Sequence, residues 1–399
     1  MLHGPATAGR PRFDIADIVR QHRAALDAEV RPTLAQRRVL SAIALCRTAA
    51  LGGHIDACRS CGLERPAYNS CRNRHCPKCQ ALRQEKWIAA RTQRLLPARH
   101  FHVVFTLPSE LRALGQCYPR ELFGALFSAA SETLADLAGS RLHARLGITM
   151  VLHTWTRDLR FHPHVHALVT AGGLSHDGER WQASNRNYLF PVQVMGMLLR
   201  GKMMEALRDL YTSKVFAYFD DFADPQAFDR LMQKLAKKSW VVYAKKPFKR
   251  VDHVLKYLGR YTHRVGISNS RLVRVSDDAV TFHTKSGKTV TLHPVEFLRR
   301  FVHHVLPDAF HKIRHYGLYA AAAETPRLAA QRHLAPSAVA STAPPMADAD
   351  SAPTSWPDQL RNLTGRDIHR CIRCGGDLEH RPVIPTLCRG PPRPTEICT

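Results

Sequence analysis

The spacing of hydrophobic positions predicts the elements of the first half of the chain. Apolar side chains between Asp14 and Cys46 recur at helical intervals, which predicts two short helices broken near Pro32. A cysteine-rich stretch follows, from His54 to Cys79. Residues Ala81 to Leu96 favour a helix, and His100 to Leu107 favour a strand that Pro108 closes. A helical pattern then returns until about Arg145.

The second half of the chain begins with two β-rich runs, Ile148 to Thr156 and Pro163 to Thr170, which are typical of central strands. Gly172 and Gly173 turn the chain after the second run. Further along, the pattern predicts helices at Val192 to Leu210, Gln226 to Lys238 and Val254 to Arg264. It also predicts strands at Trp240 to Tyr243, Leu272 to Val275 and Thr289 to Leu292, with the last two flanking a turn at Ser286-Gly287.

The segment from Ala320 to Pro357 is dominated by alanine, proline, serine and threonine, which indicates a disordered linker. A chain of 399 residues exceeds what one core usually organises, so several units are expected. We predict a helical and cysteine-rich module at 1–99, a main domain at 100–319, the linker at 320–357 and a basic tail at 358–399.

The charge of the chain changes this picture, because Lys and Arg exceed Asp and Glu by 25. Such an excess is best explained by a polyanionic partner, and nucleic acid is the expected one. No apolar run is long enough to cross a membrane, and the first residues lack the apolar stretch of a secretory signal. We therefore expect a cytoplasmic protein without a membrane partner, in which the cysteines are metal ligands or free thiols rather than disulfides.

Two CxxC pairs lie in the cysteine-rich stretch, Cys58 with Cys61 and Cys76 with Cys79. Four thiolates in two such pairs match a structural zinc site. The basic residues around them are rarely buried in a hydrophobic core, which argues against reduced core cysteines. The sequence predicts one Zn²⁺ on these four residues; Cys71, His54 and His75 are alternative ligands or part of a second site. Three basic residues of this stretch are predicted to dock DNA: Arg72, Arg74 and Lys78.

A further CxxC pair, Cys371 with Cys374, lies near the C-terminus. Only Cys388 and Cys398 follow it, and the sequence leaves a zinc site there open.

Histidine alternates with other residues in the run FHPHVHALV, at His162, His164 and His166. In a strand, side chains at i, i+2 and i+4 lie on one face, so three imidazoles are expected to point together. A divalent cation is the simplest shared partner for imidazoles on an otherwise apolar strand.

Two tyrosines, Tyr257 and Tyr261, stand four apart in the run KYLGRYTHR, so a helix would present both phenols on one face. A phenol is a weak nucleophile near neutral pH and needs cations or a metal-polarised phosphate to react. The neighbouring cations, which are also predicted to bind DNA, are Lys256, Arg260, His263 and Arg264.

The segments HPHVH, YLGRYTHRVGISNSRL and SCRNRHCPKCQ together resemble the two-tyrosine HUH transposases of rolling-circle insertion sequences. The resemblance includes their N-terminal zinc-binding domain and covers roughly His54 to Tyr319. It implies an α+β fold, in which an antiparallel-sheet nuclease core with packed helices follows a small helical and zinc-binding module and precedes a disordered tail.

The same resemblance implies the site and its reaction. His164 and His166 would bind a catalytic Mg²⁺ or Mn²⁺, with His162 or a distant polar residue as a further ligand. Tyr257 or Tyr261 would attack phosphorus to give a 5′-phosphotyrosine and a free 3′-hydroxyl. The expected partner is single-stranded DNA or the hairpin ends of an element, and self-association is left open.

Two other functions fit the same sequence. A replication initiator or relaxase would use the same chemistry, although the zinc module and the YLGRYTHR context favour a transposase. A zinc-dependent DNA-binding protein without catalysis would bind DNA and leave its strands intact.

Overall fold

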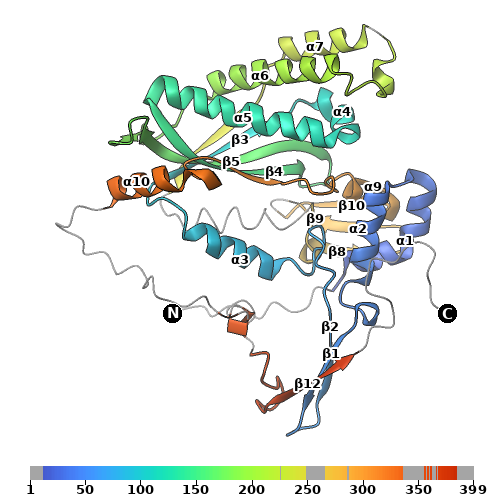
Figure 1. The fold of residues 1–399 in the computed structure, drawn as a ribbon. Coiled ribbons are helices and arrows are strands. Elements are labelled where there is room, and N and C mark those ends of the chain that lie inside the picture. The colour runs from blue at the N-terminus through green and yellow to red at the C-terminus, as the bar shows by residue number, and fades with distance from the viewer. Residues whose placement is uncertain are drawn as a thin grey trace.

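A six-stranded antiparallel sheet lies at the centre of the computed structural model (Figure 1). The structure describes residues 12–224, 226–248, 266–284, 287–335 and 367–383, with a few positions between 355 and 365. The strand order is β11-β4-β5-β3-β7, and β6 pairs with β5. The strands are β3 (His100–Thr106), β4 (Ala144–Trp155), β5 (Phe161–Ser175), β6 (Trp181–Ala183), β7 (Val242–Phe248) and β11 (Ile313–Gly317).

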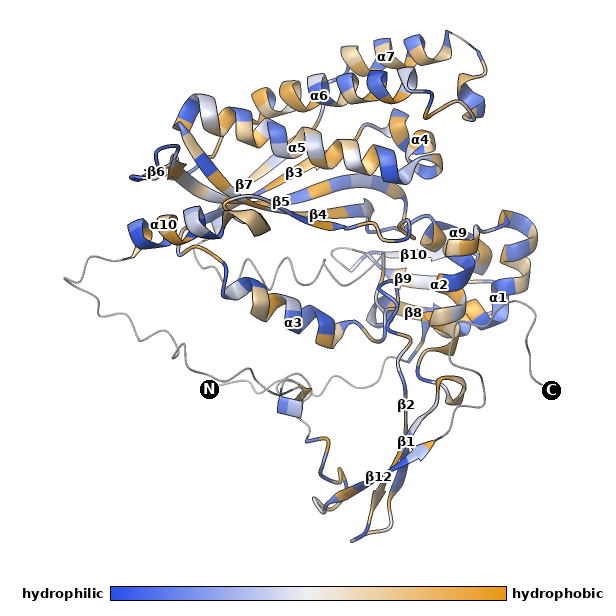
Figure 2. Cartoon of the chain, viewed as in Figure 1, coloured by the Kyte–Doolittle hydropathy of each residue, from blue (hydrophilic) through white to orange (hydrophobic). Residues whose placement is uncertain are grey.

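Helices cover one face of this sheet (Figure 1). Along β3, alternate residues Phe101, Val103 and Phe105 are fully buried in the main core that these helices close. Hydrophobic and hydrophilic residues alternate along α5 and α6, as expected for helices with one face on a sheet (Figure 2). The helices of this layer are α4 (Arg112–Cys117), α5 (Pro119–Leu142), α6 (Val192–Thr212) and α7 (Ala227–Lys237).

The opposite face of the sheet carries the histidines. Because side chains alternate along a strand, the partners of the buried core residues on β3 and β5 point away from α5. Helix α3 (Ala81–Thr92) lies on this side (Figure 1), where Trp87 packs against Val151 and Leu168. Helix α10 (Glu324–Leu334) packs near the far end, with Ala330 in a small core around Leu174 and Tyr319.

A second lobe joins the first residues of the chain to a much later segment. Helix α1 (Ile15–Val30) packs on α9 (Pro294–Val302), and the shared core includes Ile18, Leu40, Phe282 and Phe301. The lobe is completed by α2 (Leu34–Leu45) and by a three-stranded sheet of β8 (Leu272–Val275), β9 (Val280–His283) and β10 (Thr289–Leu292). The predicted division into 1–99 and 100–319 is therefore corrected, because burial of α1 and α2 requires residues from the predicted main domain.

A three-stranded ribbon extends from the rest of the molecule (Figure 1). It consists of β1 (Gly53–Cys58), β2 (Glu64–Tyr68) and β12 (Leu378–Val383), in the order β12-β1-β2. The predicted tail at 358–399 thus contributes a strand to the cysteine-rich module. Among the described residues there are also short 3₁₀ helices: η1 (Ala49–Leu51), η2 (Ser109–Leu111), η3 (Asp220–Phe222), η4 (Asn269–Arg271) and η5 (Ala321–Ala323).

Most of the predicted elements within the described residues are confirmed. The two N-terminal helices separate at Arg31-Pro32-Thr33, and a capping box between Thr33 and Gln36 starts the second. The α+β class with an antiparallel sheet is also confirmed. The pattern missed β1, β2, β6, β9, β11, β12 and α9, and the turn near Gly287 joins β9 to β10 rather than β8 to β10.

The predicted disordered linker is wrong over its first part. Residues 321–334 form η5 and α10, because their apolar side chains pack beside Tyr319 and Leu174. The predicted helix Val254 to Arg264 lies outside the described residues, as does 336–354 of the predicted linker. No helix in the described part of the chain is both long and apolar enough to span a bilayer.

Candidate functional site

Three histidines form a cluster on the face of the central sheet opposite α5. His164 and His166 come from β5, and His153 comes from the neighbouring β4. One nitrogen from each ring lies within 4.8 Å of the others. Ring centroids are 4.2 Å apart for His153 and His166, and 4.9 Å apart for His164 and His166. The three imidazoles can therefore share one ligand.

The register of the sheet explains this cluster. His153 pairs directly with His164 across β4 and β5, and directly paired side chains are closer than alternate residues on one strand. His162 lies on the same face, as predicted, with its ring 5.4 Å from that of His164. Its ring nitrogens are outside the close group. The structure thus places His153, rather than the predicted His162, with His164 and His166.

Burial keeps the clustered imidazoles neutral. Desolvation lowers the pKa of His164 to about 4. Desolvation, followed by the neighbouring imidazoles, holds the pKa of His153 and of His166 well below the ordinary histidine value. Neutral imidazole is the form that coordinates a metal.

A second layer of hydrogen bonds orients two of these rings. Nδ1 of His164 donates to the backbone carbonyl of His162 at 2.7 Å, which leaves Nε2 of His164 as its ligand atom. His102 on β3 shares a hydrogen bond of 2.7 Å between its Nε2 and Nδ1 of His166, and the two rings are stacked. Such partners hold a ligand's ring orientation and tautomer.

The histidine cluster fits a divalent metal. Three neutral nitrogen ligands on rigid strands converge, and the hydrogen bond of His164 to a backbone carbonyl is one that metal-binding histidines typically make. Alternating histidines in HFHVV hint at His102 on the sheet face, but nothing in the sequence reveals that β4 places His153 opposite His164.

The two predicted nucleophiles and their cations lie outside the described residues. These are Tyr257 and Tyr261, together with Lys256, Arg260, His263 and Arg264. They follow β7, the edge strand next to β3. On β7, Tyr243 pairs with Val104 and Lys245 pairs with His102, so both lie on the histidine face. Tyr243 is 54% exposed.

A first group of four cysteines lies beside the second lobe. It comprises Cys46, Cys71, Cys76 and Cys79, with 3.8 Å between the sulfurs of Cys71 and Cys79. Hydrogen bonds from the other three thiols lower the pKa of Cys79, Cys46 having the largest effect. Cys71 was expected only as an alternative ligand, and Cys46, at the end of α2, was not expected at all.

A second group contains Cys58, Cys61, Cys371 and Cys374. The predicted set of Cys58, Cys61, Cys76 and Cys79 is therefore corrected, because each of its CxxC pairs meets a different partner pair. Cys388 and Cys398 lie outside the described residues. Sequence spacing alone could not reveal these partners, because Cys371 and Cys374 lie more than 300 residues after Cys58.

The other alternative zinc ligands have different partners. Nε2 of His54 and Nδ1 of His380 both contact Oδ1 of Asp56, at 3.0 and 2.9 Å. Nε2 of His75 accepts from the amide of Leu306 at 3.2 Å, and its Nδ1 contacts Asn73. His54, Asp56 and His380 thus form a further group that could hold a metal ion, separate from the two cysteine groups, whereas His75 contacts the chain at Leu306.

Two of the three predicted DNA-docking residues in this module make internal contacts instead. Arg74 donates to the backbone carbonyls of Phe310 and Pro307 at 2.6 and 2.7 Å. Nζ of Lys78 lies 2.9 Å from Asp14, and the Lys78 side chain is largely buried. Arg72 is exposed and keeps the predicted role as a proposal.

A basic pocket opens beside His162, at the start of β5. Burial lowers the pKa of His162, and so does the positive charge of Arg112 and Arg160, both of which line the pocket. Arg299, Arg300 and His303 add further basic groups from α9, against one acidic residue, Glu296. A groove of this charge suits phosphate.

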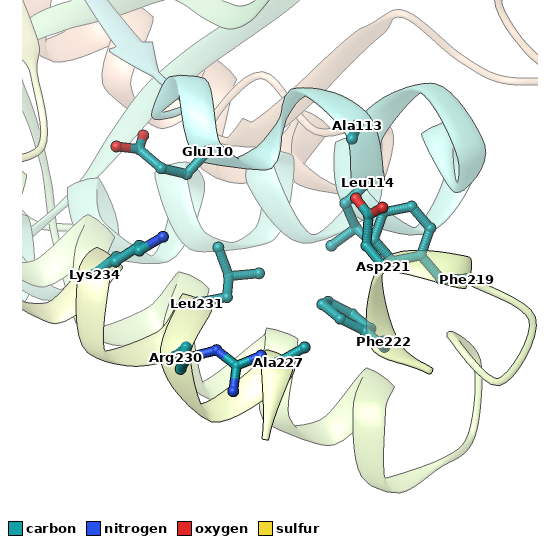
Figure 3. A pocket seen from close by; sticks show the side chains of 10 residues that line it. All are labelled: Glu110, Ala113, Leu114, Phe219, Asp221, Phe222, Ala227, Arg230, Leu231 and Lys234. Carbon is teal, nitrogen blue, oxygen red and sulfur yellow. The ribbon is translucent and has the colours of Figure 1, made fainter. Parts of the chain in front are cut away.

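A different pocket lies between α4 and α7, on the helical side of the sheet (Figure 3). Glu110 and Lys234 face each other across it, and Leu114, Phe222 and Leu231 form an apolar part of its wall. The sheet separates this pocket from the histidine cluster, so it does not contribute to that site.

Comparisons with known proteins match two parts of the chain. Residues 147–326 match a family described as "Putative transposase", and residues 18–107 match a family described as "Transposase zinc-binding domain". No significant match to a solved structure was found.

Two curated relatives cover most of the chain. "Putative transposase y4qJ" of Sinorhizobium fredii (strain NBRC 101917 / NGR234) is 42% identical over 373 residues, which are 90% of this chain and 92% of that protein. "Transposase for insertion sequence element IS801" of Pseudomonas savastanoi pv. phaseolicola is 32% identical over 290 residues, 69% of this chain and 68% of that protein.

Proposed function

The chain belongs to the transposase family of these relatives, and from this premise we propose that it cuts and rejoins single-stranded DNA in rolling-circle transposition. The observation that carries the proposal is the convergence of His153, His164 and His166 on one face of the sheet. A transposase of the proposed kind needs a phosphate-activating centre, and this cluster is suited to one.

His164 and His166 are the metal ligands of the proposed site, and His153 is the third. A bound Mg²⁺ or Mn²⁺ supplies Lewis-acid polarisation of the scissile phosphate. The three rings bind in their neutral form, and His102 and the His162 carbonyl hold the orientation of His166 and His164. Because all three side-chain ligands are nitrogens, we expect Mn²⁺ to bind more tightly than Mg²⁺, which prefers oxygen ligands.

Tyr257 and Tyr261 are the proposed nucleophiles. The phenolic oxygen bonds to phosphorus, and the bond from phosphorus to the 3′ oxygen breaks. The phenol loses its proton and the leaving oxygen gains one, giving a 5′-phosphotyrosine and a free 3′-hydroxyl. One phosphoester replaces another, so the reverse attack rejoins the strand without ATP. The second tyrosine allows a second cleavage and strand transfer.

The DNA strand is proposed to cross the histidine face. The basic pocket of Arg112, Arg160 and Arg299 lies at the His162 end, and Lys245 and the exposed Tyr243 lie toward β7. Arginines bind phosphates and an exposed aromatic ring stacks on a base, the two contacts that hold single strands.

The test is covalent capture of labelled single-stranded DNA that contains element ends. Purified protein is incubated with Mn²⁺, Mg²⁺ or EDTA and analysed by denaturing electrophoresis. We expect a metal-dependent adduct that disappears when Tyr257→Phe and Tyr261→Phe are combined. Tyr218→Phe is the matched control, because Tyr218 is 95% exposed on the helical side of the molecule. This variant should still form the adduct.

Two outcomes would contradict the proposal. DNA that is bound but never cut, on ends known to be correct, would leave a zinc-dependent DNA-binding protein without catalysis. An adduct that forms on plasmid or phage origins rather than on element ends would indicate a replication initiator or relaxase.

A further inference from the structure

The second cysteine group joins residues from the two ends of the chain. The sulfurs of Cys58 and Cys374 are 3.5 Å apart, and those of Cys61 and Cys371 are 3.7 Å apart. A tetrahedral zinc with Zn–S bonds of about 2.3 Å places its sulfurs roughly 3.8 Å from one another. A disulfide would need sulfurs about 2 Å apart and would join only two of the four. The spacing therefore fits a closed four-thiolate zinc site.

The two CxxC pairs in this group have the same local backbone structure. Each is followed by a glycine with positive φ, +68° at Gly62 and +74° at Gly375. In the first pair, the amide of Gly62 donates to the carbonyl of Cys58 at 3.0 Å. In the second, the amide of Gly375 donates to the carbonyl of Cys371 at 2.9 Å. Glycine adopts such a turn without strain, and the turn brings both sulfurs of a pair to one side.

The match extends to the residue that closes each turn. The amide of Cys58 donates to the carbonyl of Leu63, and the amide of Cys371 donates to the carbonyl of Gly376, at 2.9 and 2.7 Å. Two similar turns thus face each other across the site, although they are far apart in sequence. This arrangement is the one that two-knuckle zinc sites require.

Strand pairing supports the same association independently of the cysteines. All six residues of β12 pair with β1, from Gly53 with Val383 to Cys58 with Leu378. Arg59 forms an ion pair with Glu379 at 3.2 Å, and Arg381 forms one with Glu64 at 3.1 Å. Beneath them, the buried carboxylate of Asp56 accepts from His380 of β12 and from Arg65 of β2.

We propose that the chain binds two zinc ions and that the second is held by Cys58, Cys61, Cys371 and Cys374, so that the C-terminal tail completes the zinc-binding domain. The matched zinc-binding domain ends at residue 107, so half of these ligands lie outside it. The first ion is held by Cys46, Cys71, Cys76 and Cys79 beside the second lobe. Neither site depends on the proposed nuclease chemistry.

The first arm of the test measures zinc per chain in the full-length protein by mass spectrometry of the metal. We expect two zinc ions in the unmodified protein and one in the variant Cys371→Ser/Cys374→Ser. Cys117→Ser is the matched control, because Cys117 is exposed and belongs to neither group; it should retain two. Cys388→Ser/Cys398→Ser should also retain two. One zinc in the unmodified protein, or two in the Cys371→Ser/Cys374→Ser variant, would overturn the proposal.

The second arm identifies the ligands without relying on a variant that folds. The unmodified protein is alkylated with and without a zinc chelator, and each cysteine is quantified by peptide mass spectrometry. We expect Cys58, Cys61, Cys371 and Cys374 to be protected together and released together, whereas Cys117 reacts throughout. Rapid labelling of Cys371 and Cys374 while zinc remains bound would show that the tail does not hold the ion.

Discussion

His153 illustrates how a single buried side chain gains a role from its neighbours. Its side chain is only 3% exposed, and it lies opposite His164 on the adjoining strand. A buried imidazole needs a partner for each ring nitrogen, and a metal ion held by all three rings would occupy one nitrogen of each. His162 lies on the same face but outside the close group, half-buried beside arginines.

Replacing His153 by alanine should therefore reduce metal-dependent adduct formation by more than about 100-fold, since even loss of a ligand's hydrogen-bond partner costs 10–100-fold in metal affinity or activity. His162→Ala should stay near the unmodified protein, because its backbone carbonyl still accepts from His164. Adduct yield across an Mn²⁺ titration measures both. Equal losses of adduct in the two variants would mean that His162 is also a metal ligand.

A different buried histidine, His304, gives the fold a pH dependence. Its Nε2 donates to the carbonyl of Leu159 at 3.1 Å, and its Nδ1 accepts from Thr154 at 3.2 Å. Burial lowers the pKa of His304 to about 3. A proton therefore binds the unfolded chain, with a histidine pKa near 6.5, in preference to the folded one.

This contribution to the free energy of unfolding is complete above pH 6.5 and is lost as pH falls toward 3. Between pH 7.5 and 5.5, the free energy of unfolding should fall about 1.4 kcal/mol more in the unmodified protein than in His304→Asn. Urea titrations at the two pH values measure the difference. Parallel losses in both proteins would mean that His304 is protonated in the folded state.

At the scale of elements, the ribbon depends on one central carboxylate. Asp56 of β1 contacts His380 from β12 on one side and Arg65 from β2 on the other, and these contacts lower the pKa of its carboxyl against the effect of burial. A carboxylate in the middle strand thus links both edge strands of a ribbon with little apolar core.

Asp56→Asn should weaken the attachment of β12 by about 1–3 kcal/mol, the usual cost of leaving buried polar partners unsatisfied. Hydrogen exchange of the β12 amides reports this directly. Asp17→Asn is the control, because Asp17 is 53% exposed and pairs with Arg20 within one helix; surface changes of this kind stay within about 0.5 kcal/mol. Unchanged hydrogen exchange in Asp56→Asn would mean that the cysteines alone hold β12 on β1.

At the scale of the whole molecule, the basic residues have different roles in different places. Some of them make internal contacts, as Arg74 and Lys78 do. The pocket beside His162, between α4 and α9, holds several exposed arginines, whereas the pocket of Figure 3, between α4 and α7, combines Arg230 and Lys234 with acidic neighbours.

Combining Arg112→Ala with Arg299→Ala should weaken binding of single-stranded DNA and flatten its salt dependence. Each lost phosphate contact reduces the slope of log K against log salt by about 0.7 for single strands. Fluorescence anisotropy over a range of salt concentrations measures the slope. Arg230→Ala with Lys234→Ala is the matched control and should leave the slope unchanged; the reverse result would place the DNA at the pocket between α4 and α7.

The sequence by itself determined most of the helices, the central strands and the family, and it indicated the chemistry of the candidate sites. Periodicity located the N-terminal helices and the central strands, because an amphipathic face is a property of neighbouring residues. The alternation in HPHVH likewise placed His164 and His166 on one face. CxxC spacing indicated zinc, because both thiols of a pair come from one turn.

Only the tertiary structure decided which of these parts meet. Sheet register brought His153 to His164, strand pairing brought Cys371 and Cys374 to Cys58 and Cys61, and packing brought α1 onto α9. Some of these contacts join segments more than 300 residues apart, and no local sequence pattern predicts such a pairing. They exist because burying apolar faces and pairing strand edges are satisfied by the whole chain together.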